Sequence, residues 1–191
     1  WSVCCFETAA LISLTLRGSN MERELTEVYC GNGKGKTALA IGQSLREATQ
    51  GKSVIVIQFL KGRERRSLDF LQELMNLDFK IFRFEKQDCC YAELTEEEKK
   101  EENVNILNGV NFARKVIVTQ ECDFLLLDEI LGLVDKGIVT VDTVADILKQ
   151  KDESMHIVMT GWNLPEELRP YVDVITTLNT EEINADSVKG E

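Results

Sequence analysis

From Met21 onward, the chain alternates between two patterns of hydrophobic positions. Short apolar runs rich in β-branched residues, such as SVIVIQF, are typical of strands buried on both faces of a parallel sheet. Between these runs, apolar residues recur every three or four positions, as they do on the buried face of a helix. The patterns predict strands at 27–30, 53–59, 79–84, 123–129, 156–161 and 173–178, and helices at 37–50, 67–77, 94–118, 140–150 and 164–172.

Repeated strand–helix–strand units require parallel pairing with right-handed crossovers. The order of elements therefore predicts an α/β fold with three layers, in which a mostly parallel sheet of about six strands lies between helices. Ligands of such sheets bind at the carboxyl ends of the strands. We expect residues 21–178 to form this domain, residues 1–20 to be a non-native or disordered N-terminal extension, and residues 179–191 to be a disordered acidic tail.

Composition narrows the class of protein. The 191 residues carry a net charge of −11, which argues against non-specific nucleic-acid binding because a phosphate backbone requires a basic surface. No apolar run reaches the roughly 20 residues of a membrane-spanning helix. Six cysteines, none of them in a C-x-x-C pair, and a single histidine give little support to a zinc site. These features predict a cytoplasmic protein with reduced thiols that binds neither nucleic acid nor membrane.

The sequence CGNGKGKT at 30–37 lies between a predicted strand and a predicted helix, which is the context of a phosphate-binding loop. Its glycines allow backbone N–H groups to point at phosphate oxygens, and the helix N-terminus adds donors and a partial positive charge. Lys36 would reach the outer phosphates, and the Thr37 hydroxyl would bind Mg²⁺. Cys30 departs from the usual pattern, in which this first position is glycine. The residues predicted to contact the nucleotide are Gly31, Asn32, Gly33, Lys34, Gly35, Lys36, Thr37 and Ala38.

The second part of such a site is an acidic residue at the end of a buried strand, and FLLLDE at 124–129 supplies two. Asp128 would hold Mg²⁺ directly or through water, and Glu129 would orient a substrate group or act as a base. A strand that ends in acidic residues is a weak signal alone, but it gains weight from the glycine loop upstream. Together the two features predict a nucleoside triphosphate site.

Four segments together resemble the ATP:corrinoid adenosyltransferase family that acts on cob(I)yrinic acid a,c-diamide. They are VYCGNGKGKT, VIVIQFLKGR, FLLLDEILGLVDKGIV and HIVMTGWNLPEELRPYVDVIT, and the likeness covers about residues 26–176. The resemblance implies a P-loop NTPase fold of the RecA-like type. It also implies a reaction in which a reduced corrinoid attacks C5′ of ATP and inorganic triphosphate leaves.

The resemblance extends to individual positions. It implies Lys36, Thr37 and Glu129 as catalytic residues, with Lys36 and Mg²⁺ on Thr37 stabilising the departing triphosphate and Glu129 contacting the ribose or the metal. Arg46, Lys61 and Arg63 match family positions near the ATP, although a solvated surface charge explains each of them equally well. The partners that the resemblance allows are ATP, a reduced corrinoid, an electron-donor protein and a second copy of the chain in a homodimer.

Three segments depart from the family pattern. Trp162 follows Thr160-Gly161 at a position where the family usually carries arginine, which removes a phosphate contact. QDCCYAEL replaces an aromatic-rich segment near the corrinoid and leaves Tyr91 as the candidate stacking ring, and the basic tail of the family is absent. Two alternatives therefore stay open: a non-catalytic paralogue that binds ATP or corrinoid, and a P-loop ATPase in which Glu129 activates water.

Overall fold

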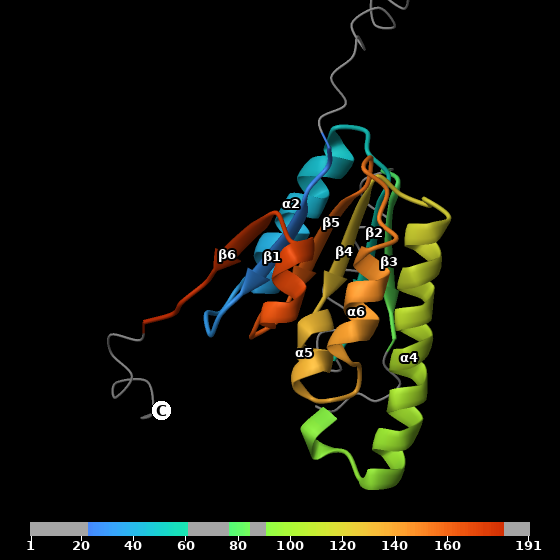
Figure 1. The fold of residues 1–191 in the computed structure, drawn as a ribbon, viewed down its shortest axis with the longest axis vertical. Coiled ribbons are helices and arrows are strands. Elements are labelled where there is room, and N and C mark those ends of the chain that lie inside the picture. The colour runs from blue at the N-terminus through green and yellow to red at the C-terminus, as the bar shows by residue number, and fades with distance from the viewer. Residues whose placement is uncertain (1–22, 61–76, 85–90, 182–191) are drawn as a thin grey trace, which may run out of the picture.

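The computed structural model describes residues 23–60, 77–84 and 91–181. Six strands form one sheet, and each pairing within it is parallel. The strands are β1 (Thr26–Cys30), β2 (Val54–Gln58), β3 (Phe79–Arg83), β4 (Phe124–Asp128), β5 (His156–Thr160) and β6 (Val174–Thr177), and they lie in the order β3-β2-β4-β5-β1-β6. The predicted α/β fold around a mostly parallel sheet of about six strands is confirmed (Figure 1).

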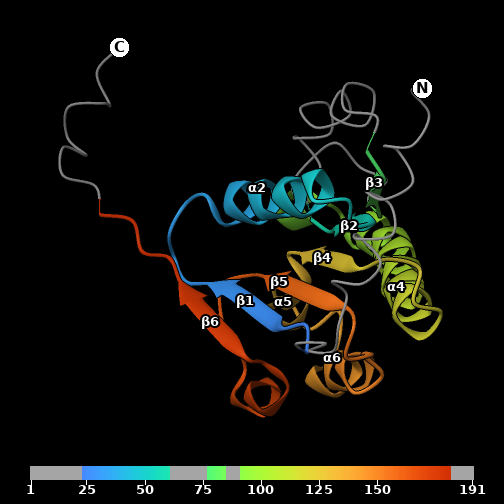
Figure 2. The same cartoon turned by 90° about the horizontal axis from the view of Figure 1, so that it is seen from above.

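Helices cover both faces of this sheet, which gives the three predicted layers (Figure 2). α2 (Lys36–Thr49) packs on one face, and α4 (Glu96–Val118), α5 (Ile130–Asp135) and α6 (Val141–Leu148) pack on the other. Two 3₁₀ segments, η1 (Tyr91–Glu93) and η2 (Glu166–Tyr171), complete the described elements. Within the described ranges, no helix combines the length and the apolar character that crossing a bilayer requires.

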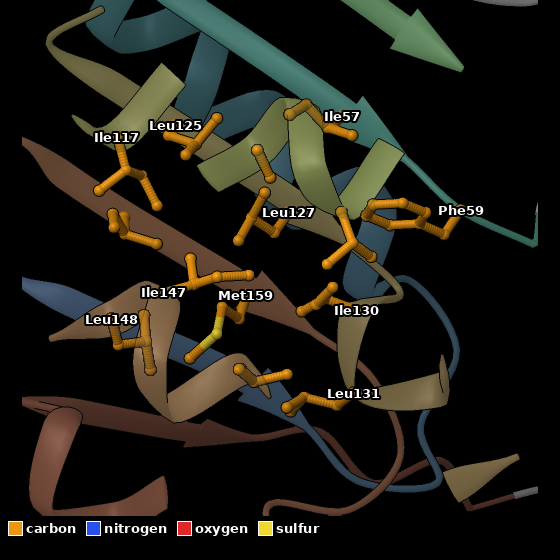
Figure 3. Close-up of a cluster of buried hydrophobic side chains, with 14 of the residues drawn as sticks. Ile57, Phe59, Ile117, Leu125, Leu127, Ile130, Leu131, Ile147, Leu148 and Met159 are labelled. Atoms are coloured by element: carbon orange, nitrogen blue, oxygen red, sulfur yellow. The ribbon is translucent and has the colours of Figure 1, made fainter. Parts of the chain in front are cut away.

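Successive side chains of a strand point to opposite faces of the sheet, which divides the buried side chains into two clusters. In β2, Ile57 belongs to the cluster under α4, α5 and α6, whereas its neighbour Val56 belongs to the cluster under α2. Figure 3 shows part of the first cluster, where Leu127 and Met159 of the sheet lie among helical side chains such as Ile147. Because the central strands are buried on both faces, their sequences are nearly continuous apolar runs.

The predicted elements that fall within the described residues are found within two residues of their expected ends. The segment expected as a helix at 164–172 is a 3₁₀ helix, with Pro170 inside it. α5 was not predicted, because its six residues are too few to show a helical period. The helix predicted at 67–77 lies outside the described residues.

The start of α4 matches its sequence signature. The Thr95 backbone N–H donates to Glu98 Oε2 at 2.8 Å, and the Glu98 N–H donates to Thr95 Oγ1 at 3.3 Å, so the predicted capping box is confirmed. The extension predicted at 1–20 and residues 182–191 of the tail lie outside the described residues, so the expected domain limits stay predictions.

Strand order determines where the polar residues of the sheet meet. β5 lies between β1, which leads into the glycine loop, and β4, which ends at Asp128. Gln58, Asp128 and Thr160 are the last residues of β2, β4 and β5, and all three are buried. Alternation places their side chains on the face that α2 covers. The carboxyl edge of the sheet beside the start of α2 is therefore the place to look for a site.

Candidate nucleotide site

Residues 31–35 connect β1 to α2 and form the glycine loop. Gly35 occupies the N-cap position with φ of 96°, a left-handed conformation that glycine adopts at little cost. The structure gives no side-chain cap at this helix start, and the first turn of α2 contains no acidic residue. The N-terminal N–H groups and the positive end of the helix dipole therefore meet no negative charge from their own helix, and they suit a bound anion.

Lys36 is the first residue of α2, and its side chain turns back over the loop. Its ammonium donates to the carbonyl oxygens of Gly31 at 2.7 Å and Gly33 at 2.9 Å, and the residue is only 9% exposed. The ring of Trp162 lies over the same ammonium, 5.8 Å from Nζ to the ring centroid. The predicted phosphate-binding lysine is thus held within the loop.

Asp128 is the centre of a buried hydrogen-bond cluster. Its Oδ1 accepts from Thr37 Oγ1 at 3.0 Å and from Thr160 Oγ1 at 2.7 Å, and its Oδ2 accepts from Gln58 Nε2 at 3.0 Å. Asp128 is completely buried. Arg83 extends the cluster, since its Nε donates to Gln58 Oε1 at 3.1 Å. Three donors offset the cost of burying this carboxylate, and they fix its orientation toward the start of α2.

Glu129 follows Asp128 in a left-handed backbone conformation, with φ of 66°. Such a conformation is unfavourable for a residue other than glycine, by about 1 kcal/mol or more. The Thr160 hydroxyl supports it by accepting from the Glu129 N–H at 2.8 Å. A Cβ added at Gly132 would lie 2.9 Å from Glu129 Oε1, so the Glu129 side chain lies against the first turn of α5.

The chain that follows β6, Leu178–Thr180, packs directly on the glycine loop, and we call it the post-β6 segment. The Gly33 N–H donates to the Leu178 carbonyl at 2.8 Å, and the Lys34 N–H donates to Thr180 Oγ1 at 2.8 Å. In return, the Leu178 N–H donates to the Cys30 carbonyl at 2.8 Å. Two of the loop amides therefore bind the chain itself in this conformation.

The structure brings most of the predicted site residues to one edge of the sheet. The members of the group are Gly31, Asn32, Gly33, Lys34, Gly35, Lys36, Thr37, Ala38, Asp128 and Glu129. Arg46 does not join them: it lies in the last turn of α2, about 15 Å from Lys36 along the helix axis, and pairs with Glu47 at 2.9 Å. Lys61 and Arg63 lie outside the described residues. The roles assigned to all of these residues stay predictions.

Tyr91, the candidate stacking ring, lies in η1. Its hydroxyl donates to Asn103 Oδ1 at 2.8 Å, and Lys136 Nζ lies 5.8 Å from its ring centroid. The ring also packs against the hydrophobic cluster under α4, α5 and α6. Tyr91 belongs to the QDCCYAEL segment at 87–94, of which residues 87–90 lie outside the described ranges.

Three residues of the buried cluster were not predicted as site residues: Gln58, Arg83 and Thr160. One signal in the sequence points to Gln58, because a polar residue ends an otherwise apolar run that is buried on both faces. Thr160 likewise ends the apolar run of β5. Arg83 shows no such signal, because β3 is not a continuous apolar run and already carries a charged residue at Lys80.

Comparison with known proteins agrees with a nucleotide site at the start of α2. Residues 22–187 match the family described as ATP:corrinoid adenosyltransferase BtuR/CobO/CobP. A corrinoid adenosyltransferase of Escherichia coli K12 is 25% identical over 161 residues, which are 82% of this chain and 77% of the relative. The corrinoid adenosyltransferase CobA of Salmonella typhimurium is 24% identical over 161 residues, with the same coverage, and one of Sinorhizobium is 28% identical over 168 residues, covering 82% of this chain and 72% of the relative. The family that the sequence resembles is thereby confirmed: this chain belongs to the ATP:corrinoid adenosyltransferases.

Proposed function

We propose that this protein transfers the 5′-deoxyadenosyl group of ATP to the cobalt of a reduced corrinoid and releases inorganic triphosphate. The observation that carries the proposal is the meeting of Lys36, Thr37 and Asp128 at the start of α2, in a chain that matches the family from residue 22 to residue 187. We further propose cob(I)yrinic acid a,c-diamide as the corrinoid.

The reaction places a clear demand on the protein. The electron pair of the reduced cobalt forms the bond to C5′, and the C5′–O bond breaks with its electrons left on the triphosphate. The leaving group therefore gains negative charge during the step. Lys36 and the N-terminus of α2 are fixed donors that can stabilise this charge where it develops, and fixed donors need little reorganisation. We propose that Glu129 contacts the ribose or the metal.

Thr37 and Asp128 are the residues that would hold Mg²⁺. The hydroxyl and the carboxylate oxygens are hard ligands of the kind that Mg²⁺ prefers, and they already lie 3.0 Å apart. A bound Mg²⁺ would neutralise part of the charge on the ATP phosphates. The Asp128 carboxylate is fixed by Gln58 and Thr160, so the protein presents these oxygens in one orientation.

Three further features complete the proposal. The cob(I) state requires a reductant, which we propose to be an electron-donor protein. We place the reaction in the cytoplasm, because the two cysteines of the described residues, Cys30 and Cys122, are free thiols. We also propose that the chain acts as a homodimer.

The test is to incubate the protein with MgATP, with and without chemically reduced corrinoid, and to identify the inorganic product. We expect triphosphate, formed only when the corrinoid is present. Phosphate released without corrinoid would instead indicate a P-loop ATPase, and binding of MgATP without either product would indicate a non-catalytic paralogue.

Variants localise the reaction to the site. Lys36→Ala should abolish nucleotide binding, whereas Lys149→Ala, which removes an exposed lysine at the C-cap of α6 paired with Asp146, should leave binding unchanged. Retained MgATP binding by Lys36→Ala would refute the assignment of the loop.

A further inference from the structure

Trp162 lies where β5 ends, and its backbone is joined to the glycine loop. Its carbonyl oxygen accepts a hydrogen bond from the Gly31 N–H at 2.8 Å. The residue is 58% exposed, which is unusual for tryptophan, the largest apolar residue in proteins. The exposed ring thus belongs to a residue that the backbone holds firmly against the loop.

The same ring covers the ammonium of Lys36. Nζ lies 5.8 Å from the ring centroid, within the distance at which a cation and an aromatic face attract each other. Two of the three ammonium protons are used by the carbonyl oxygens of Gly31 and Gly33. Gly31 connects both contacts, since its N–H donates to Trp162 and its carbonyl accepts from Lys36. Main chain and ring therefore restrain one lysine from two sides.

We propose that Trp162 is a positioning residue for Lys36, which holds the ammonium above the glycine loop so that it meets the phosphate tail of the nucleotide. A lysine ammonium on a flexible four-carbon stem loses much rotamer freedom when it binds a phosphate. A ring that already confines the ammonium reduces that loss and shields one side of the charge from water. The inference rests on the nucleotide-binding step of the proposed function and not on the transfer to cobalt.

The first test compares two variants at this position. Trp162→Leu removes the aromatic face and keeps an apolar side chain, whereas Trp162→Phe keeps an aromatic face and serves as the matched control. Titration calorimetry with MgATP and with magnesium tripolyphosphate measures both affinities without any corrinoid. We expect Trp162→Leu to weaken both ligands about fivefold, the size of a partly exposed cation–aromatic contact, and Trp162→Phe to stay within about twofold of wild type.

Two outcomes of this titration would overturn the inference. If Trp162→Leu weakened MgATP but left tripolyphosphate unchanged, the ring would be contacting the nucleoside and not positioning the lysine. If neither affinity fell, the ring would have no role in nucleotide binding.

The second test measures the contact in the free protein. An aromatic ring shifts the NMR signals of nearby protons, so the Lys36 ε-methylene signal should be displaced upfield, and its loss in Lys36→Arg assigns it. We expect the displacement to persist in Trp162→Phe and to disappear in Trp162→Leu. An undisplaced Lys36 signal in wild type would refute the positioning role. Because both tests omit corrinoid, a protein that passes them but transfers no adenosyl group would contradict the proposed function alone.

Discussion

Replacing Thr160 with valine tests whether the buried cluster around Asp128 stabilises the fold. The Thr160 hydroxyl donates to Asp128 Oδ1 at 2.7 Å and accepts from the Glu129 N–H at 2.8 Å, and Thr160 is completely buried. Valine has nearly the same shape, so the change removes these two hydrogen bonds and leaves little cavity. A hydrogen bond to a charged group contributes about 1.5–3 kcal/mol, and a buried amide without a partner costs about 1–3 kcal/mol. We expect Thr160→Val to lower the free energy of unfolding by about 3 kcal/mol.

Urea unfolding measures this difference. With a denaturant slope of about 2 kcal/mol per molar urea, the unfolding midpoint of Thr160→Val should fall by about 1.5 M. Thr176→Val is the matched control, since Thr176 is a half-buried strand threonine whose side chain makes no hydrogen bond within the described part of the chain. The control should stay within about 0.5 kcal/mol of wild type. Equal midpoints for the two variants would refute the reasoning that the Thr160 hydroxyl stabilises a buried charge.

Three other predictions follow from the described contacts. Gly33→Ala should destabilise the fold by about 1–3 kcal/mol in urea unfolding, because a Cβ there would lie 2.6 Å from the Leu178 carbonyl carbon. Its control, Gly42→Ala in α2, should be neutral or stabilising, because the space around an added Cβ is open. Burial raises the pKa of the Cys122 thiol to about 12, so little of the reactive thiolate is present at pH 8. Peptide mapping after iodoacetamide treatment at pH 8 should therefore find Cys122 alkylated far more slowly in native than in unfolded protein, and equal rates would contradict its burial. Hydrogen bonds from Thr95, the capping threonine of α4, lower the pKa of Glu98 from its ordinary 4.5, so ionised Glu98 stabilises the folded protein above pH 4.5 and this stabilisation is lost as the pH falls through the lowered pKa. The difference in melting temperature between wild type and Glu98→Gln should therefore be larger at pH 7 than at pH 3. A difference that did not depend on pH would contradict this.

The parts of the fold that depend on short stretches of sequence could be predicted. A strand, the glycine loop and a helix follow one another within residues 26–49, so their order alone indicated a phosphate-binding loop. Asp128 could be placed near that loop because all strands of a parallel sheet end at the same edge. The capping box of α4 was equally local, since its two residues are three positions apart.

The parts that depend on strand order could not be predicted. Thr160 and Gln58 meet Asp128 because β5 and β2 flank β4, and no pattern in the sequence specifies which strands are neighbours. The contact of Trp162 with Lys36 is long-range in the same way. The sequence allowed only the inference that Trp162 removes a phosphate contact, whereas the structure shows its ring over the lysine.

The packing of the post-β6 segment gives the glycines of the loop a second purpose. A Cβ at Gly31 would lie 2.3 Å from the Leu178 carbonyl oxygen, and one at Gly33 would be about as crowded by the same backbone. Neither position has room for a larger residue beside the post-β6 segment. A descendant of this protein that had lost all affinity for ATP would still be destabilised by a larger residue at either position. Gly31 and Gly33 are therefore needed for the stability of the fold, and evidence for retained chemistry has to come from Lys36, Thr37 and Asp128.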